Sequence, residues 1–547
     1  MFELRLASLG SLSLRAALVR LLAAACAIAS TAPVAPLAAQ EIDVVELTVE
    51  DVQAAYASGR FTAVELTRAF LDRIERYEDY YNAFISMNPA ALEIAAELDT
   101  EYAASGPRGP LHGVPVVIKD NIDYAGLVTT AGWEGFSTAA GGIDMIPDDD
   151  AAVVTRLREA GAIILGKTNL PDFAANGTRT RSSVAGRTLN AYHVGRTPGG
   201  SSGGTATAVN ASFAVLGLGT ETGGSIQNPA SAQGLVSVKP THGLVPIEGV
   251  VPINATYLDV VGPLAKSVHD AAVALDVLAG PTTEDPATFS SAGHVPNDGY
   301  AASLGSVSLQ GRRFGLVGAG WRRDRVPLDS ATERLYRDAV TTAVGLGAEV
   351  VRDPFAGTGF VDLYAERPSV PTQRDQDMLA YLQGLGPSAA FHSVEEWERL
   401  SGRSFDSHDG GEAGRERRAR TAPARQSATE EGDAYQAWRQ RLRTLFRDVL
   451  GAHELDGLLF PQASAPGRDL VADPSRPDFE PNDWPEIPSN IVNDLGVPVV
   501  TVPYAYYGDG TPFVLALVGD MWSEAALLAY AYELEQATRA RRAPMLY

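Results

Sequence analysis

Strand-like apolar segments alternate with amphipathic segments along this chain, and this alternation restricts its fold more than any other feature. Residues 150–169 (DAAVVTRLREAGAIILGKTN) predict a helix, a glycine stop and then an apolar strand. The same order recurs at 201–219 and at 328–351, and residues 112–120 (HGVPVVIKD) predict a further buried strand. Strands that alternate with helices indicate an α/β fold in which helices cover both faces of a sheet.

Two more helices are expected near the start of the chain, over residues 46–58 and 62–77. Thr62 and Glu65 have the spacing of a capping box, in which each side chain bonds to the backbone of the other residue. Apolar residues follow at helical spacing, which predicts that the second helix buries one face.

Residues 400–433 depart from the alternating pattern. They are polar, lack periodicity and mix both charges. We interpret them as a surface excursion from one large domain that covers residues 40–547. A lid over a pocket is the alternative interpretation.

Residues 1–39 have the features of an export signal. Arginines supply positive charge, an apolar stretch spans residues 16–29, and small residues offer a cleavage site near Ala39. A membrane anchor is disfavoured because the apolar run is short. A lipoprotein signal is the third alternative, since small residues precede Cys26, but the leucine usual three positions earlier is absent. We therefore expect a secreted or periplasmic protein without stable membrane association after cleavage.

The charge and the cysteine content exclude several classes of function. The formal net charge is -23, which argues against nucleic acid and anionic membranes as partners. Cys26 is the single cysteine, so the mature chain is expected to have no disulfide and no thiolate metal ligand. The histidines form no HExxH pair, so no metal is expected. Nothing in the sequence indicates an oligomeric state.

Two serine–glycine clusters lie within residues 195–232, one at 199–204 (GGSSGG) and one at 223–225 (GGS). Glycines allow backbone N–H groups to approach a ligand closely, and several such groups together stabilise an oxyanion. Ser225 could therefore be a nucleophile within its own oxyanion hole. The alternatives are a phosphate-binding loop, which lacks the GxxxxGK[ST] pattern, and a pair of tight turns.

A serine nucleophile needs a base, and Lys119 is the candidate. Ser225 does not lie in a GxSxG motif, because Ile226 and Gln227 follow it, and His242 follows a further strand-like run. Lys119 ends the apolar run at 112–120, where burial would lower its pKa and allow the neutral amine to accept a proton. The alternative for Lys119 is a salt bridge with Asp120.

Several strings in the chain resemble the amidase signature hydrolases. They are strongest over residues 110–275 and nearly absent over 281–455. The matching strings are GVPVVIKDNID (113–123), GKTNLPDFA (166–174), RTPGGSSGG (196–204), GLGTETGGSIQNPAS (217–231) and GLVSVKPTHGLVP (234–246). The resemblance implies the amidase signature fold, with a mixed central sheet, and hydrolysis of carboxamide bonds in a small-molecule or peptide substrate without a cofactor.

The resemblance also implies the roles of individual residues. Ser225 would be the nucleophile, Ser201 the bridging serine after a cis peptide bond, and Lys119 the base. The 24-residue separation of the two serines agrees with the family pattern. The backbone N–H groups of Thr222, Gly223, Gly224 and Ser225 would form the oxyanion hole. Ser202 and Gly200 would support the triad, and Asp172 would contact the substrate.

The chain departs from the family beside the nucleophile. Glu221 stands where the family often has Asp, and Gln227 where it often has Arg, so only a hydrogen bond could replace the usual ion pair. The GTET sequence is similar to the peptide amidase branch, which removes C-terminal amides. A subunit of a tRNA-dependent amidotransferase and a non-catalytic binding protein on the same scaffold are the alternative functions.

Overall fold

The computed structural model describes residues 42–370, 374–405, 428–471, 484–488 and 490–547. Residues Val44–Tyr547 form one compact unit. The predicted export signal, residues 1–39, lies outside the described residues. No helix among those that the structure describes is long and apolar enough to cross a membrane.

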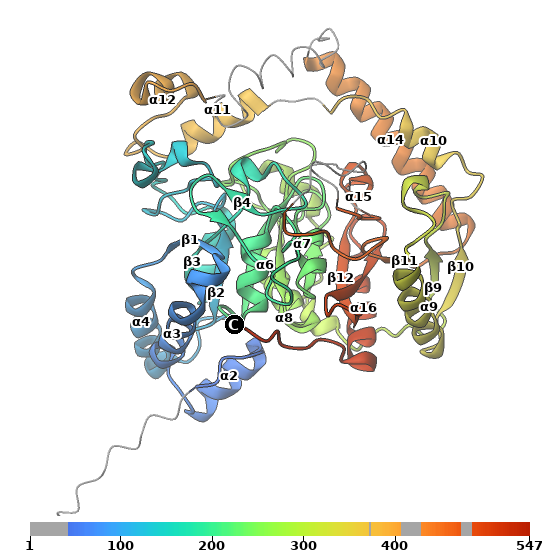
Figure 1. The fold of residues 1–547 in the computed structure, drawn as a ribbon, viewed down its shortest axis with the longest axis horizontal. Helices are drawn as coiled ribbons and strands as arrows, with labels where there is room; N and C mark the ends of the chain where they lie inside the picture. Colours follow the sequence, from blue (N-terminus) through green and yellow to red (C-terminus); the bar gives the residue numbers. More distant parts are fainter. Residues whose placement is uncertain (1–41, 371–373, 406–427, 472–483, 489) are drawn as a thin grey trace, which may run out of the picture. The chain divides into compact units, whose positions relative to one another are not determined.

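The described residues form an 11-stranded mixed sheet flanked by helices, as predicted (Figure 1). In spatial order the strands are β1 (Phe84–Met87), β3 (Ile163–Thr168), β2 (Pro115–Lys119), β6 (Leu216–Glu221), β8 (Val260–Ala265), β7 (Val236–Lys239), β12 (Val499–Tyr506), β13 (Pro512–Val518), β11 (Gly457–Pro461), β9 (Arg313–Leu316) and β10 (Glu349–Arg352). Strands β3, β2 and β6 are parallel, β6 pairs antiparallel with β8, and β11, β9 and β10 are again parallel.

The helices follow the alternation that the sequence predicts. The helix at Gly203–Asn210 (α6) packs against β6 and β2, and the helix at Val268–Leu278 (α8) packs against β8 and β7. The helices are α2 (Val49–Ser58), α3 (Ala63–Tyr81), α4 (Ala91–Ser105), α5 (Ala152–Glu159), α6 (Gly203–Asn210), α7 (Gln227–Ala232), α8 (Val268–Leu278), α9 (Ser330–Gly345), α10 (Phe360–Ala365), α11 (Arg374–Gly384), α12 (Val394–Ser401), α14 (Ala428–Ala452), α15 (Ile491–Leu495) and α16 (Glu524–Thr538).

The predicted capping box at the start of α3 is present. Thr62 Oγ1 accepts a hydrogen bond from the Glu65 N–H, and the Glu65 carboxylate accepts one from the Thr62 N–H. The helix runs to Tyr81, four residues beyond the predicted end, because its last turn also buries an apolar side chain. The local sequence thus determines where this helix begins better than where it ends.

The predicted excursion at 400–433 is only partly described, and its last part is helical. Residues 406–427 lie outside the described residues, whereas 428–433 belong to α14. The buried face of α14 begins further on, with Tyr435, Trp438 and Leu442. Residues 428–433 (ATEEGD) contain no large apolar residue, and for that reason the sequence shows no helical period there.

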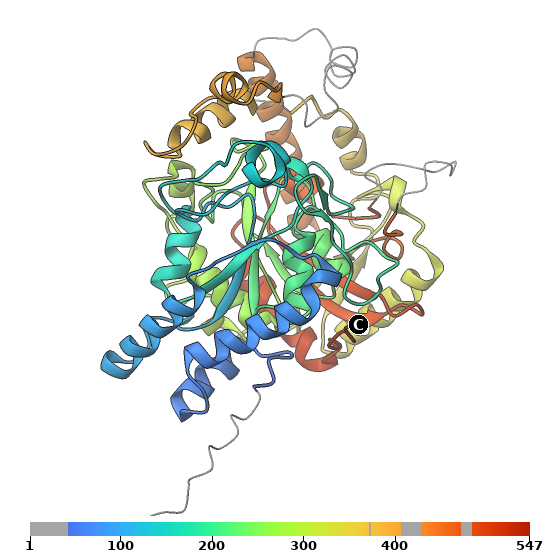
Figure 2. The same cartoon turned by 60° about the vertical axis from the view of Figure 1, so that its left-hand side comes forward.

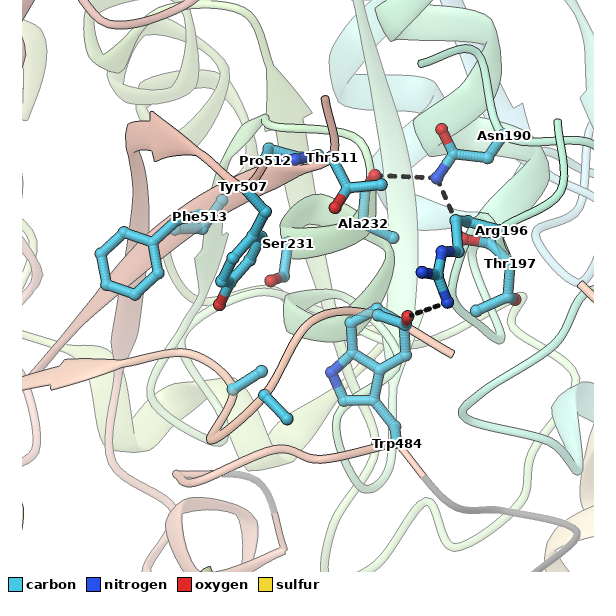
Figure 3. Close-up of a pocket in the computed structure, with 14 residues that line it drawn as sticks. Asn190, Arg196, Thr197, Ser231, Ala232, Trp484, Tyr507, Thr511, Pro512 and Phe513 are labelled. Atoms are coloured by element: carbon cyan, nitrogen blue, oxygen red, sulfur yellow. Dashed lines mark hydrogen bonds between the residues drawn. The ribbon is translucent and has the colours of Figure 1, made fainter. Parts of the chain in front are cut away.

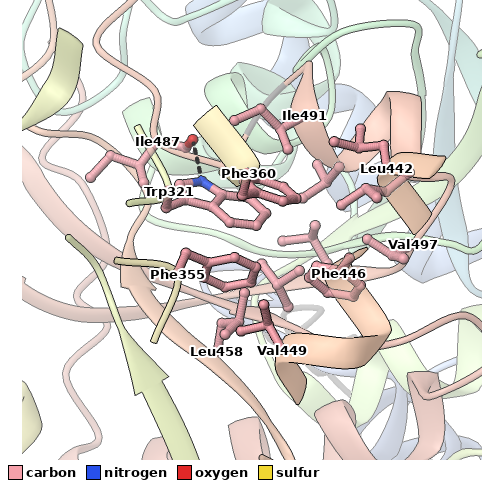
Figure 4. Packing of buried hydrophobic residues seen from close by; sticks show 14 of the residues in the cluster. Trp321, Phe355, Phe360, Leu442, Phe446, Val449, Leu458, Ile487, Ile491 and Val497 are labelled. Carbon is pink, nitrogen blue, oxygen red and sulfur yellow. Dashed lines mark hydrogen bonds between the residues drawn. The ribbon is translucent and has the colours of Figure 1, made fainter. Parts of the chain in front are cut away.

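A large apolar cluster joins side chains of α14 and α15 to side chains of the strands β11, β12 and β13 (Figure 4). Trp321 is 1% exposed and stacks on Phe360, with ring centroids 5.1 Å apart. Its indole Nε1 donates a hydrogen bond to the Ile487 carbonyl at 3.2 Å. Trp321 is therefore a core residue, and its packing holds the segment that leads into α15.

A second aromatic cluster joins α11 and α12 to loops between residues 131 and 173. Trp133, Phe136 and Phe173 pack against Trp397 and other buried side chains. The Trp397 Nε1 donates to the Gly135 carbonyl at 3.0 Å. Both ribbon views place α11 and α12 over these loops (Figure 1, Figure 2). This packing positions α11, whose Tyr381 reaches the cavity discussed below.

Candidate active site

Lys119 ends β2, between the parallel strands β3 and β6, and its side chain is fully buried. The Lys119 Nζ lies 2.7 Å from Ser201 Oγ, 2.8 Å from Thr220 Oγ1 and 3.3 Å from the Thr220 carbonyl oxygen. Ser201 precedes α6 and Thr220 lies on β6, so three separate segments meet at this amine.

The surroundings of Lys119 favour the uncharged amine. Burial lowers the pKa of Lys119 to about 7, although the nearby carboxylates of Asp259 and Glu221 oppose that shift. A neutral amine has two N–H groups and one lone pair. If the two N–H groups are donated to the two Thr220 oxygens, the lone pair remains for the Ser201 hydroxyl. The geometry therefore suits Lys119 as a proton acceptor.

The pKa of Lys119 predicts how activity depends on pH. Below about pH 7 the amine binds a proton and its lone pair is lost, so kcat/KM should fall about tenfold per pH unit. Above that pH the rate should reach a plateau. The measurement is kcat/KM between pH 5 and 9 with an amide that does not itself titrate. A rate that is independent of pH across this range would contradict the assignment.

Asp120 does not pair with Lys119, so the alternative of a Lys119–Asp120 salt bridge is wrong. Lys167 Nζ lies 3.1 Å from Asp120 Oδ1, and both side chains are fully buried. The Thr130 hydroxyl and N–H also donate to Asp120. Successive side chains along a strand point to opposite faces, and Asp120 follows directly after the last residue of β2. The Lys119 amine therefore contacts the hydroxyls of Ser201 and Thr220 instead of a carboxylate.

Replacing Lys167 with methionine should destabilise the fold by about 3–5 kcal/mol, because Asp120 would remain buried without its cation. Urea unfolding followed by tryptophan fluorescence would measure this change. Arg337→Ala is the control, since Arg337 pairs with Glu333 on the exposed face of α9 and should contribute less than about 1 kcal/mol. Equal losses in both variants would show that the buried pair is not important for stability.

The first serine–glycine cluster forms the entry to α6. The Gly200–Ser201 peptide bond is cis, as the resemblance implies. A side chain at Gly200 would collide with the Asn176 carbonyl, since a Cβ there would lie 2.4 Å from that oxygen. Ser202 Oγ contacts both the N–H and the carbonyl of Thr220, each at 3.2 Å. Ser202 therefore holds the residue that contacts Lys119, which suits the supporting role predicted for it.

The second cluster follows β6 and leads into α7. Ser225 is 7% exposed, and its carbonyl accepts a hydrogen bond from the Ser202 N–H at 3.2 Å, which joins the two clusters. No described residue accepts a hydrogen bond from the N–H groups of residues 222–225. These N–H groups suit the oxyanion hole predicted there, and the catalytic roles themselves remain predictions.

Glu221 and Gln227 hold the nucleophile loop together through hydrogen bonds. The Gln227 Nε2 donates to Glu221 Oε1 at 2.6 Å. The other carboxylate oxygen accepts from the N–H groups of Ile226 and Gln227, at 2.8 and 3.1 Å. A hydrogen bond to a neutral amide thus replaces the ion pair that is common in the family, as expected. Glu221 joins the residue before the loop to the two residues that follow Ser225.

Asp172 lies at the start of a short 3-10 helix, η3 (Asp172–Ala174). Its carboxylate accepts a hydrogen bond from the Ser183 N–H at 2.7 Å. Phe173 and Ala174 both have a positive φ angle, 50° and 53°, which residues other than glycine rarely adopt. Contact between Asp172 and the substrate remains a prediction.

Three residues near the site were missed by the sequence analysis. Thr220 lies within one of the strings that resemble the family. The only sign of a role for it was its position on a strand next to a glycine-rich turn. The Asp259 carboxylate accepts a hydrogen bond from the Thr222 hydroxyl at 2.5 Å. Asn490 lies so close to the loop that a Cβ on Gly223 would be 2.5 Å from its Oδ1. The last two approach from distant segments and leave no local pattern.

A small cavity lies beside α7, and neither Lys119 nor Ser225 is among the residues that line it (Figure 3). Its walls include Asn190, Ser231, Trp484 and Tyr507. The volume of about 10 Å³ admits about one water molecule. This cavity is therefore too small for an amide substrate. A larger cavity, of about 580 Å³, has Asp259 in its wall and so lies against the nucleophile loop.

Comparisons with known proteins found similar sequences over most of the chain. A protein-family profile described as Amidase matches residues 65–528. Among curated proteins, a Glutamyl-tRNA(Gln) amidotransferase subunit from Synechococcus sp. (strain CC9605) is 33% identical over 499 residues, which cover 90% of this chain and 97% of that protein. The corresponding protein from Geobacter sp. (strain M21) is 32% identical over 513 residues, with 92% of this chain and 100% of that protein covered.

Solved structures show the same architecture. The native peptide amidase from Stenotrophomonas maltophilia has a TM-score of 0.74 and 34% identity, and the match covers 92% of this chain and 99% of that one. A 6-aminohexanoate cyclic dimer hydrolase has a TM-score of 0.72 at 23% identity over 92% of this chain and 99% of that one, a likeness of fold alone.

Proposed function

This chain belongs to the amidase signature family, and we propose that it hydrolyses carboxamide bonds through Lys119, Ser201 and Ser225 after export from the cytoplasm. The amidase activity follows from the family. The contact of 2.7 Å between a fully buried lysine and Ser201 is the observation that supports the assignment of the base.

In the proposed mechanism, the neutral amine of Lys119 takes the proton of Ser201, which in turn takes the proton of Ser225. The Ser225 oxygen attacks the amide carbon, and the carbonyl electron pair moves onto its oxygen. The N–H groups of residues 222–225 stabilise that oxyanion, and each such donor can contribute about 2.7–4 kcal/mol. The proton then returns along the same path to the leaving nitrogen, and the C–N bond breaks.

The second half of the reaction reverses the same proton path. Water loses a proton to the serine–lysine pair and attacks the acyl-enzyme ester. The ester bond to Ser225 breaks, the serine recovers its proton, and a carboxylic acid leaves.

The substrate that we propose is a peptide with a C-terminal amide or a small aryl or alkyl amide. The likeness to a peptide amidase over nearly the whole chain supports this class. The test is release of amine or ammonia from peptide amides, aryl acylamides, lactam-derived amides and carbamates. A fluorophosphonate should also label Ser225, as mapped by mass spectrometry. Labelling elsewhere, or none in folded protein, would favour a non-catalytic binding protein instead.

The identity to amidotransferase subunits supports a second candidate, a subunit of a tRNA-dependent amidotransferase. The predicted export signal and the net charge of -23 argue against it. Fractionation of the native host distinguishes the two. An exported enzyme should be recovered outside the cytoplasm with a mature N-terminus near Gln40, whereas a cytoplasmic protein bound to partner subunits would favour the second candidate.

A further inference from the structure

A cavity of about 580 Å³ beside the site is lined almost entirely by one sign of charge. Eight of its lining side chains are carboxylates, and none of the described residues that line it is a lysine or an arginine. They come from segments far apart in the sequence and include Asp123, Asp149, Glu248, Asp259, Asp285 and Asp377.

The cavity is connected to the proposed nucleophile loop through Asp259. The Asp259 Oδ1 accepts a hydrogen bond from the Thr222 hydroxyl at 2.5 Å. The Asp259 Oδ2 accepts hydrogen bonds from the N–H groups of Ile253 and Asn254, at 2.9 and 2.8 Å. Thr222 lies three residues before Ser225. A group in this cavity would therefore be near an amide held at the oxyanion loop.

The negative charge of the cavity is poorly balanced by cations. Asp150 forms a salt bridge with Arg158. The carboxylates of Glu248 and Asp285 instead accept hydrogen bonds from neutral backbone N–H groups, those of Ala152 at 3.2 Å and Ile247 at 2.9 Å. Burial raises the pKa of Glu248, and the neighbouring carboxylates of Glu284, Asp149 and Asp285 raise it further. This repulsion disfavours the charged form of Glu248, and a cationic ligand in the cavity would relieve it.

Two of the carboxylates leave an oxygen without a hydrogen-bond donor. Asp123 is 3% exposed, and the hydroxyls of Thr129 and Tyr381 both donate to its Oδ1, at 2.7 and 2.8 Å. No described group donates to Asp123 Oδ2. Asp377 Oδ2 is also buried without a hydrogen bond. A buried carboxylate oxygen normally has a donor, so Asp377 Oδ2 indicates a ligand that supplies an N–H group.

The shape of the cavity favours an organic cation over a metal ion. Within the described part of the chain, no three Asp, Glu, His or Cys side chains converge on a point where a metal could bind. The carboxylates are spread around a large space that Val245, Pro252 and the ring of Tyr381 also line. An alkyl chain could pack on these apolar surfaces while its charged end meets the carboxylates.

We propose that this cavity binds a protonated amine or guanidinium of the substrate, so that the enzyme prefers amides that carry a positive charge. The proposal rests on the proposed amidase function and specifies the substrate class at the same site. Lysine and arginine side chains of peptide amides have the required chemistry, with an alkyl stem and a terminal N–H cation.

The experiment compares matched pairs of peptide amides that differ in charge, with lysine against norleucine and arginine against citrulline. We expect kcat/KM to be at least about tenfold higher for the cationic member at low salt, and the ratio to fall in 0.5 M NaCl. Asp377→Asn and Glu248→Gln should each reduce the ratio several-fold. Glu333→Gln, an exposed carboxylate on α9, is the control and should leave the ratio unchanged.

Two outcomes separate this proposal from the amidase function itself. Equal kcat/KM for both members of each pair would overturn the cation site and leave the amidase function intact. If neither member is hydrolysed, calorimetric titration of both into Ser225→Ala still measures the preference in binding. Equal affinities there would overturn the cation site as well.

Discussion

Ser225→Ala should lose about 10⁴- to 10⁶-fold in kcat for amide hydrolysis, because the attacking oxygen is removed and the rest of the site keeps its shape. The change removes only the hydroxyl group from a small side chain, so the protein should fold normally. Ammonia release from a peptide amide by purified protein measures the loss, and circular dichroism checks the fold.

Ser231→Ala is the matched control for this experiment. Ser231 is 6% exposed, lies on the following helix α7 and undergoes the same chemical change. Its activity should stay within about threefold of the parent enzyme. If Ser225→Ala kept more than a tenth of the parental activity, another residue would have to be the nucleophile.

Removal of the amine of Lys119 should have the second largest effect, a loss of about 10²- to 10⁴-fold in kcat/KM. Lys119→Met keeps an apolar stem of similar length and removes the proton acceptor. Lys119→Arg keeps a cation that cannot lose its proton, so it should be equally inactive. Steady-state kinetics at pH 8, where the parent amine is neutral, measure both variants.

Lys266→Met provides the control for the loss of a buried lysine. Lys266 is 4% exposed, and its Nζ donates to the Ala214 carbonyl at 3.2 Å, outside the proposed site. This variant should be less stable than the parent but should retain its rate to within a few-fold. An active Lys119→Arg enzyme would contradict the role of Lys119 as a base, since a guanidinium stays charged.

The sequence predicted the parts of the site that depend on local spacing. The strand that ends at Lys119 and the glycine-rich entries to α6 and α7 are all present. The resemblance also placed the cis peptide bond correctly before Ser201. These features follow from short patterns of apolar residues and glycines, which act through the backbone of their own segment.

Contacts between neighbours in the sequence were predicted less well. Lys119 and Asp120 are adjacent, and a salt bridge between them was an open alternative. The structure pairs Asp120 with Lys167 on β3 instead. Which residue lies across from each side chain depends on the order and register of the strands, and a single sequence does not contain that order.

The sequence by itself determined the α/β class, the family and the residues that resemble a catalytic triad, because each of these is encoded in contiguous strings. Only the tertiary structure decided that Thr220 and Ser201 meet at the Lys119 amine, that Asp259 supports the nucleophile loop, and that carboxylates from distant segments line one cavity. The physical reason is that burial, pKa shifts and electrostatic potential arise from groups brought together across the fold, and sequence separation carries no measure of those distances.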